Sequence, residues 1–170
     1  MSGAFNFQKW IEDNRDQLKP PVGQKCMIDD DFIVMVVGGP NKRKDYHYEE
    51  GPEFFYQVEG DITVKIIENG EPKDINIKEG EMYYLPPRIP HSPQRSEGSI
   101  GLVIERKRVD GEMDGLQWYC ENCGNKLYEE FFQLENIVEQ LPPIMNKFYA
   151  DEDKRTCSNC GTVMEPPVKK

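Results

Sequence analysis

The chain has 170 residues, enough for one domain of ordinary size and a small appendage. Hydrophobic residues make up 37% of it, which suffices for one core. With 31 acidic against 21 basic residues the net charge is −10, and such a surface is repelled by nucleic acid and by anionic membranes. We therefore expect neither as a partner.

The amino-terminal segment carries no sign of export. Residues 1–6 lack the basic stretch followed by an apolar one that a signal peptide requires. No apolar run approaches the roughly 18 residues that would span a bilayer. Four of the five cysteines sit in two close pairs, which in a chain without an export signal favours metal binding over disulfides. These features predict a soluble, cytoplasmic protein.

The first 110 residues change from a helical to a strand pattern. Apolar residues at helical spacing predict a short amphipathic helix over residues 7–18, which the prolines at positions 20 and 21 end. Short apolar stretches then predict strands over 32–37, 62–67, 75–77, 82–85 and 100–104. Asn69-Gly70 predicts a hairpin turn. Because many open strand edges would invite aggregation, we expect a mainly β fold closed into a barrel.

A second part of the chain begins near residue 111. Cys120, Cys123, Cys157 and Cys160 form two near-identical Cys-x-x-Cys-Gly pairs. Between the pairs, Leu134, Ile137, Val138 and Leu141 predict a helix that stops at Pro142-Pro143. We expect residues 1–110 to form the barrel with its helix, residues 111–165 to form a metal-binding segment packed on it, and 166–170 to be a disordered tail.

The two cysteine pairs suit tetrahedral binding of zinc or iron by four thiolates. Gly124 and Gly161 directly follow the pairs and would permit the positive φ that such turns commonly require. Four protein ligands leave no open position on a metal, so a structural role is favoured over a redox one. Cys26 stands alone and is interpreted as a small buried apolar residue.

The chain has only two histidines. A histidine taken alone is most often a hydrogen-bonded core or surface residue, but here the flanking residues change that interpretation. Two stretches resemble the paired motifs of the cupin superfamily: His47, Glu53 and Gly60 in the first, Gly80, Pro86 and His91 in the second. The usual second histidine of the first motif is replaced by Glu49, and the inner glycine of the second by Arg88. The resemblance implies a jelly-roll barrel.

The missing histidine leaves two imidazoles and one carboxylate, the set that holds iron(II) with open coordination positions. Such positions let a substrate and dioxygen both reach the metal. We expect His47, Glu53 and His91 to be the iron ligands. Glu49 is the alternative carboxylate, and the spacing from Glu53 to Gly60 favours Glu53.

Longer stretches resemble the 3-hydroxyanthranilate 3,4-dioxygenase family, in its bacterial and fungal form with four cysteines. They are residues 39–47, 53–57, 85–87, 91–95 and 103–106 of the predicted barrel, and 118–120 and 148–155 of the cysteine segment. The resemblance covers nearly all of the chain from Trp10 to Cys160. It implies a homodimer, and a rubredoxin-like iron centre in the cysteine segment.

The family implies ring opening of 3-hydroxyanthranilate by dioxygen at iron(II). The product, 2-amino-3-carboxymuconate 6-semialdehyde, closes unaided to quinolinate, a precursor of NAD made from tryptophan by the kynurenine pathway.

The family also implies roles for individual residues. Arg95 would grip the substrate carboxylate, since a guanidinium binds carboxylates bidentately. Glu105 would bind the substrate or accept a proton from it, Glu53 would lie beside the substrate, and Arg43 would face dioxygen and stabilise developing negative charge.

The ordinary fate of such residues is a solvated surface charge. Glu105 ends an apolar strand, which favours burial, whereas the role of Arg43 rests on the resemblance. Apolar residues such as Phe54, Val34 and Leu102 would supply an apolar wall, and the sequence alone does not assign which of them point inward.

Two other classes of function compete with the oxygenase. A zinc-ribbon module would bind nucleic acid or protein through a basic face with exposed aromatic residues, and the acidic balance disfavours it. A cupin without catalysis would only store or sense a ligand, and the retained His, Glu and His set with its arginines disfavours that.

Overall fold

The computed structural model describes residues 3–20 and 23–167, apart from the side chains of residues 137 and 138. Most of the predicted tail over 166–170 lies outside the described residues. In the part of the chain so described, no helix is both long and apolar enough to cross a membrane.

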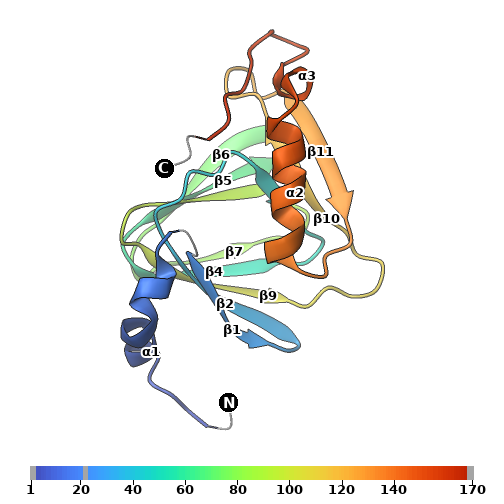
Figure 1. Cartoon of the computed structure of the whole chain (residues 1–170). Coiled ribbons are helices and arrows are strands. Elements are labelled where there is room, and N and C mark those ends of the chain that lie inside the picture. Colours follow the sequence, from blue (N-terminus) through green and yellow to red (C-terminus); the bar gives the residue numbers. More distant parts are fainter. Residues whose placement is uncertain (1–2, 21–22, 168–170) are drawn as a thin grey trace.

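Two antiparallel sheets face each other and enclose the core (Figure 1). The first sheet has the order β1-β2-β9-β4-β7 and the second the order β11-β10-β3-β8-β5-β6. Their strands are β1 (Gln24–Asp29), β2 (Phe32–Gly38), β3 (Tyr46–Tyr48), β4 (Glu53–Glu59), β5 (Ile62–Glu68), β6 (Glu71–Ile77), β7 (Met82–Leu85), β8 (His91–Arg95), β9 (Ile100–Arg106), β10 (Asp114–Tyr119) and β11 (Lys126–Phe132). The predicted mainly β barrel is confirmed.

Strand alternation decides which residues face inward. In β4, Glu53, Phe55 and Gln57 are buried while the residues between them are half-buried. Phe55 packs in the barrel core with side chains from both sheets: Ile62, Val64, Ile66, Ile77, Leu85 and Val103. The predicted hairpin joins β5 to β6, with positive φ at Asn69 (54°) and Gly70 (84°), as a tight turn between twisted strands requires.

The predicted amino-terminal helix is present but shorter than expected. The α-helix α1 (Phe7–Asn14) passes into a 3₁₀ turn, η1 (Arg15–Leu18). The Asn14 side-chain amide donates to the Trp10 carbonyl over 2.7 Å, which competes for the oxygen that continues an α-helical ladder. Ile11 and Leu18 nevertheless bury their side chains against the outer face of the first sheet.

The predicted stop of the second helix is wrong. Helix α2 (Ile137–Tyr149) runs through Pro142 and Pro143. Its buried side chains Ile144 and Phe148 pack on β10, where the rings of Phe148 and Trp118 stack 4.3 Å apart. Each such burial contributes about 1.5–3 kcal/mol, which offsets the roughly 3 kcal/mol that a proline inside a helix costs.

The cysteine segment continues the second sheet. Strand β10 pairs with β3 on one side and β11 on the other, and α2 lies along this end of the molecule (Figure 1). A short helix, α3 (Glu152–Arg155), leads into the second cysteine pair. The division of the chain at residue 110 stays a prediction, and β10 joins the two parts through β3. Cys26 is exposed on β1, so the expectation that it is buried is wrong.

Candidate active site

Two cross-strand pairs place the predicted metal ligands. His47 on β3 lies directly opposite His91 on β8, in the second sheet. Glu53 on β4 lies directly opposite Glu105 on β9, in the first sheet. Because the two sheets face each other and all four side chains are buried, the pairs meet in the interior.

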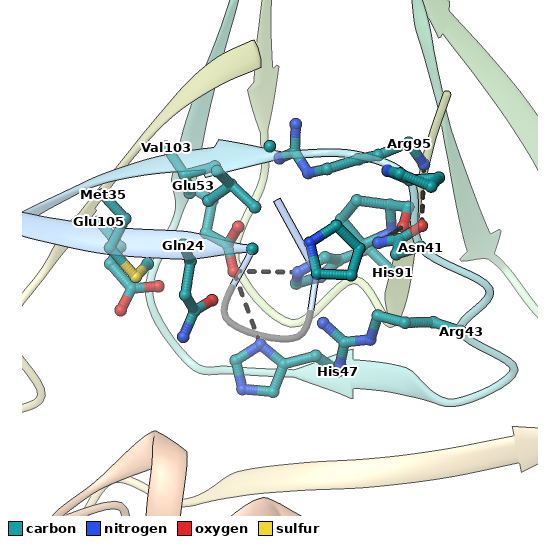
Figure 2. A pocket seen from close by; sticks show the side chains of 16 residues that line it. Gln24, Met35, Asn41, Arg43, His47, Glu53, His91, Arg95, Val103 and Glu105 are labelled. Carbon is teal, nitrogen blue, oxygen red and sulfur yellow. Dashed lines mark hydrogen bonds and ion pairs between the residues drawn. The ribbon is translucent and has the colours of Figure 1, made fainter. Parts of the chain in front are cut away.

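The three predicted ligands converge. Glu53 Oε1 lies 2.9 Å from His91 Nε2 and 3.7 Å from His47 Nδ1, as Figure 2 shows. One donor atom from each of the three lies within 4.8 Å of the others. Two imidazoles and a carboxylate at this separation fit a divalent transition metal, and three ligands leave positions open.

Hydrogen bonds fix the direction of both rings. The His47 Nε2–H donates to Asp114 Oδ2 over 2.7 Å, which turns Nδ1 toward Glu53. On His91, Nδ1 lies 3.1 Å from the carbonyl oxygen of Ile89, and Nε2 faces Glu53. Metal-binding histidines characteristically have such a partner on their other nitrogen. The sequence analysis missed Asp114, although an acidic residue before the mostly apolar residues 115–118 resembles the signal that singled out Glu105.

The charges around these ligands favour a cation. Burial alone would lower the pKa of His47, but hydrogen bonds to Asp114 and Glu53 raise it to about 10. Burial alone would raise the pKa of Glu53, but the two histidines lower it instead. The site therefore attracts positive charge, which a metal ion can supply in place of a proton.

The alternative ligand Glu49 is also buried, and one of its carboxylate oxygens lies within 4.8 Å of oxygens of Glu53 and Glu105, but it is paired with Arg108. One of its oxygens, Oε2, pairs with Arg108. The other, Oε1, has no hydrogen-bond partner among the described residues. Burial, with the nearby charges of Glu53 and Glu105, raises the pKa of Glu49 to about 9. Of the two candidates, Glu53 is the one whose carboxylate lies between the histidines.

Exchanging each carboxylate for its amide separates the two candidates. Glu53→Gln is expected to lose the barrel metal, because an amide is a much poorer ligand for a divalent cation, whereas Glu49→Gln should keep it. The measurement is metal per chain after anaerobic reconstitution with iron(II), with the wild type alongside. Loss in Glu49→Gln and retention in Glu53→Gln would make Glu49 the ligand.

The three ligands line a cavity of about 280 Å³ that also holds the other predicted site residues. Its apolar wall consists of Met35, Val37 and Val103. Val34, Phe54 and Leu102, the examples given for this wall, each lie one position from a lining residue, since neighbouring residues point to opposite faces of a sheet. Leu102, for example, packs under α1.

Arg95 is buried beside this cavity with an unused donor. Its Nη1 atom has no hydrogen-bond partner among the described residues. Burial, together with the charge of Arg43, lowers the pKa of Arg95 to about 10, so the guanidinium remains charged near neutral pH. Asn41 fixes the backbone here, because its Oδ1 accepts from the Arg95 N–H over 2.9 Å (Figure 2). A buried cation with a free donor suits an anionic ligand.

Arg43 and Glu105 also line the cavity. Asp45 accepts from Arg43 Nε over 3.1 Å, which sets the direction of the guanidinium. Glu105 accepts from Arg108 Nη1 over 2.7 Å. Burial, and then the charge of Glu53, raises the pKa of Glu105. The structure therefore brings together all six residues predicted for this site.

The four paired cysteines form a second, separate cluster. Their Sγ atoms lie within 4.8 Å of one another. Gly124 (φ 72°) and Gly161 (φ 74°) have the expected positive φ, and each donates its N–H to the carbonyl of the first cysteine in its pair. The two turns also contact each other. The amide nitrogen of Asn122 lies 3.6 Å from Cys160 Sγ, and that of Asn159 lies 3.5 Å from Cys123 Sγ. This donor set fits a tetrahedral metal.

Breaking the cysteine cluster should lower stability and spare the chemistry. Cys120→Ser is expected to lower the thermal midpoint by about 5–10 °C, because metal binding energy here is largely folding energy. Turnover at low temperature should persist. Melting curves, dioxygen uptake and metal content are measured, and Cys26→Ser is the matched control that should change none of them. Complete loss of activity in a folded Cys120→Ser variant would give the cluster a part in the chemistry.

Comparison with known proteins agrees with this architecture. A family model described as 3-hydroxyanthranilic acid dioxygenase matches residues 1–149. Proteins named 3-hydroxyanthranilate 3,4-dioxygenase are 56% identical over 165 residues in Xanthomonas euvesicatoria pv. vesicatoria (strain 85-10), and 53% identical over 169 residues in Jannaschia sp. (strain CCS1). These alignments cover 97% and 96% of this chain, and 94% of each relative.

A crystal structure of a protein from Neisseria meningitidis has a TM-score of 0.50 and 20% identity, and covers 62% of this chain and 100% of that one. This likeness concerns the fold alone. The facing antiparallel sheets, with histidines and carboxylates turned inward, form the cupin-type barrel that the sequence predicted. Within that class, the match to the family model and the identity to relatives over nearly the whole chain are decisive. The chain belongs to the 3-hydroxyanthranilic acid dioxygenase family.

Proposed function

We propose that this enzyme opens the ring of 3-hydroxyanthranilate with dioxygen to give 2-amino-3-carboxymuconate 6-semialdehyde, which closes to quinolinate. The observation that carries the proposal is one cavity that joins a His, Glu and His set to a buried arginine with a free donor. The names of the close relatives support the same substrate.

We propose iron(II) as the metal held by His47, Glu53 and His91. The donor set is the one that favours iron(II) with open positions, and the surrounding carboxylates favour a cation. Bound there, iron(II) would supply binding positions for the substrate oxygen and nitrogen and for dioxygen. The protein contributes the fixed directions of its two imidazole rings and a cavity with one apolar wall.

The remaining residues of the cavity are proposed to orient the substrate. Arg95 would bind its carboxylate through the donor that has no protein partner. Glu105, whose raised pKa makes its carboxylate a stronger base, would accept a hydrogen bond or a proton from the ring substituents. Arg43 would face dioxygen and stabilise negative charge. Met35, Val37 and Val103 would contact the apolar ring.

Consumption of dioxygen tests this function directly. The full chain, reconstituted anaerobically with iron(II), is expected to take up one dioxygen per 3-hydroxyanthranilate. Anthranilate, which lacks the phenol, is the matched control and should give no uptake. Equal uptake with both compounds, or none with either by an iron-loaded protein, would reject the proposal.

We further propose that the enzyme is a cytoplasmic homodimer with iron or zinc in the cysteine cluster.

The outer face of the first sheet carries an apolar row across four strands: Val34, Ile104, Phe54 and Tyr84. Tyr84 and Met82 at its edge are 57% and 64% exposed, and a second copy would cover them. Sedimentation is expected to give a dimer, and Tyr84→Glu a monomer. A monomeric wild type would contradict the proposal.

A further inference from the structure

Arg108 occupies the connection between β9 and β10 and reaches three buried carboxylates. Its side chain is 12% exposed. It donates to Asp114 through Nε over 2.9 Å and Nη2 over 2.6 Å, and to Glu105 through Nη1 over 2.7 Å. Nη2 also pairs with Glu49. One guanidinium thus binds residues from three different parts of the chain.

Two of these carboxylates connect Arg108 to the active site, Asp114 through His47 and Glu105 directly. Asp114 is fully buried and binds His47 Nε2, so the Arg108–Asp114 pair fixes the ring that presents Nδ1 to Glu53. Glu105 lines the cavity itself. Arg108 lines a neighbouring depression, which it shares with Glu105 and Met35. It therefore acts on the site from outside the cavity.

The loop that carries Arg108 is itself fixed. Arg106 Nη1 donates to Glu112 Oε2 over 2.7 Å, and the backbone N–H of Val109 donates to the same carboxylate over 2.9 Å. The N–H of Met113 donates to Glu50 over 3.2 Å. The first two contacts close the connection upon itself and the third ties it to the segment before β4, so the backbone that carries Arg108 is fixed on both sides.

We propose that Arg108 is the positioning residue that sets the metal-binding ring of His47 and the substrate-facing carboxylate of Glu105 at the same time. The inference rests on the proposed function of the cavity. A single residue then couples the affinity for the metal to the placement of the substrate.

Arginine suits this position better than lysine. Its planar fork offers five donors in fixed directions, and four are needed for the contacts observed here. A lysine would keep the charge but could not hold all three carboxylates in these directions. With a neutral residue at position 108, the carboxylates of Glu49, Glu105 and Asp114 would remain buried near one another without a cation and would repel one another.

Five variants of the full chain separate the two routes. Arg108→Met removes the contacts to both Asp114 and Glu105, and Arg108→Lys keeps the positive charge without the guanidinium fork. Asp114→Asn affects the His47 route, and Glu105→Gln the substrate route. Arg15→Met is the matched control, since it breaks a bidentate arginine–carboxylate pair, with Glu59, on another surface. The cysteine cluster is first loaded with zinc, and the dissociation constant for iron(II) is then measured anaerobically, followed by KM and kcat at saturating iron(II).

The expected pattern distinguishes positioning from general stability. Arg108→Met should weaken iron(II) binding by about 10- to 100-fold and also lower kcat/KM by on the order of 100-fold. Asp114→Asn should change mainly the iron(II) affinity, and Glu105→Gln mainly the kinetics. Arg108→Lys should lie between wild type and Arg108→Met in both. Arg15→Met should match the wild type.

Wild-type iron(II) affinity and kinetics in a folded Arg108→Met would overturn the inference, even with a lower melting midpoint. If Arg108→Met does not fold, Arg108→Lys decides, and wild-type values in it would likewise overturn the inference. A wild-type protein that binds no iron(II) in the barrel, or takes up no dioxygen, would instead reject the proposed function.

Discussion

His47→Ala is expected to abolish dioxygen uptake on 3-hydroxyanthranilate while the barrel stays folded. The variant keeps only Glu53 and His91 of the three proposed ligands, and two ligands hold iron(II) far more weakly than three. The fold should survive, because the barrel core is built from apolar side chains of both sheets and Asp114 keeps its pair with Arg108.

Three measurements on this variant make the result specific: dioxygen uptake, iron per chain and the thermal midpoint. Lys73→Ala, which removes an exposed ion pair of β6, is the control and should match the wild type in all three. Appreciable uptake by His47→Ala with barrel iron still bound would show that His47 is not a ligand.

Arg95→Ala is expected to lower kcat/KM for 3-hydroxyanthranilate by about 10- to 150-fold. The estimate corresponds to the roughly 1.5–3 kcal/mol that a hydrogen-bonded charged partner contributes. Most of the change should appear in KM if the carboxylate is bound equally in the ground and transition states. Steady-state dioxygen uptake at saturating iron(II) measures both constants.

A truncated substrate tests whether the loss comes from the carboxylate. 2-Aminophenol keeps the amine and the phenol but lacks the carboxylate, so the wild type should use it less well. Arg95→Ala should then turn over 2-aminophenol about as well as the wild type does, which closes a double cycle on the contact. An equal loss on both substrates would mean that Arg95 acts on the site in some other way.

The spacing of motifs predicted which side chains converge in the cavity better than strand patterns predicted the strands that carry them. His47 and His91 lie on β3 and β8, neither of which was predicted. Strand β8 contains Pro93 and polar residues, yet four of its five side chains are buried. Local propensity cannot indicate such a strand, because its neighbours β3 and β5 supply the pairing.

The rest of the site could not be predicted for geometric reasons. A shift of one residue along a strand exchanges the two faces of a sheet, so the sequence alone did not assign whether Val34 or its neighbour Met35 lines the cavity. Arg108 and Asp114 lie in a connection and at a strand start, where no periodicity indicates direction. In α2 the local sequence misled in the opposite direction. Its two prolines predicted the end of the helix, but packing on β10 outweighs their effect and the helix continues.

The pairing of β3 also bears on when the chain can first bind the metal proposed for the barrel. This three-residue strand lies between β8 and β10, both of which follow it at a distance in the chain. All three ligands have been synthesised once residue 91 is made, but Asp114, which orients His47, comes with β10. During translation the ligands therefore exist before the contact that aligns them. We expect a ribosome-bound chain to capture iron poorly until β10 has emerged, so that loading follows completion of the barrel.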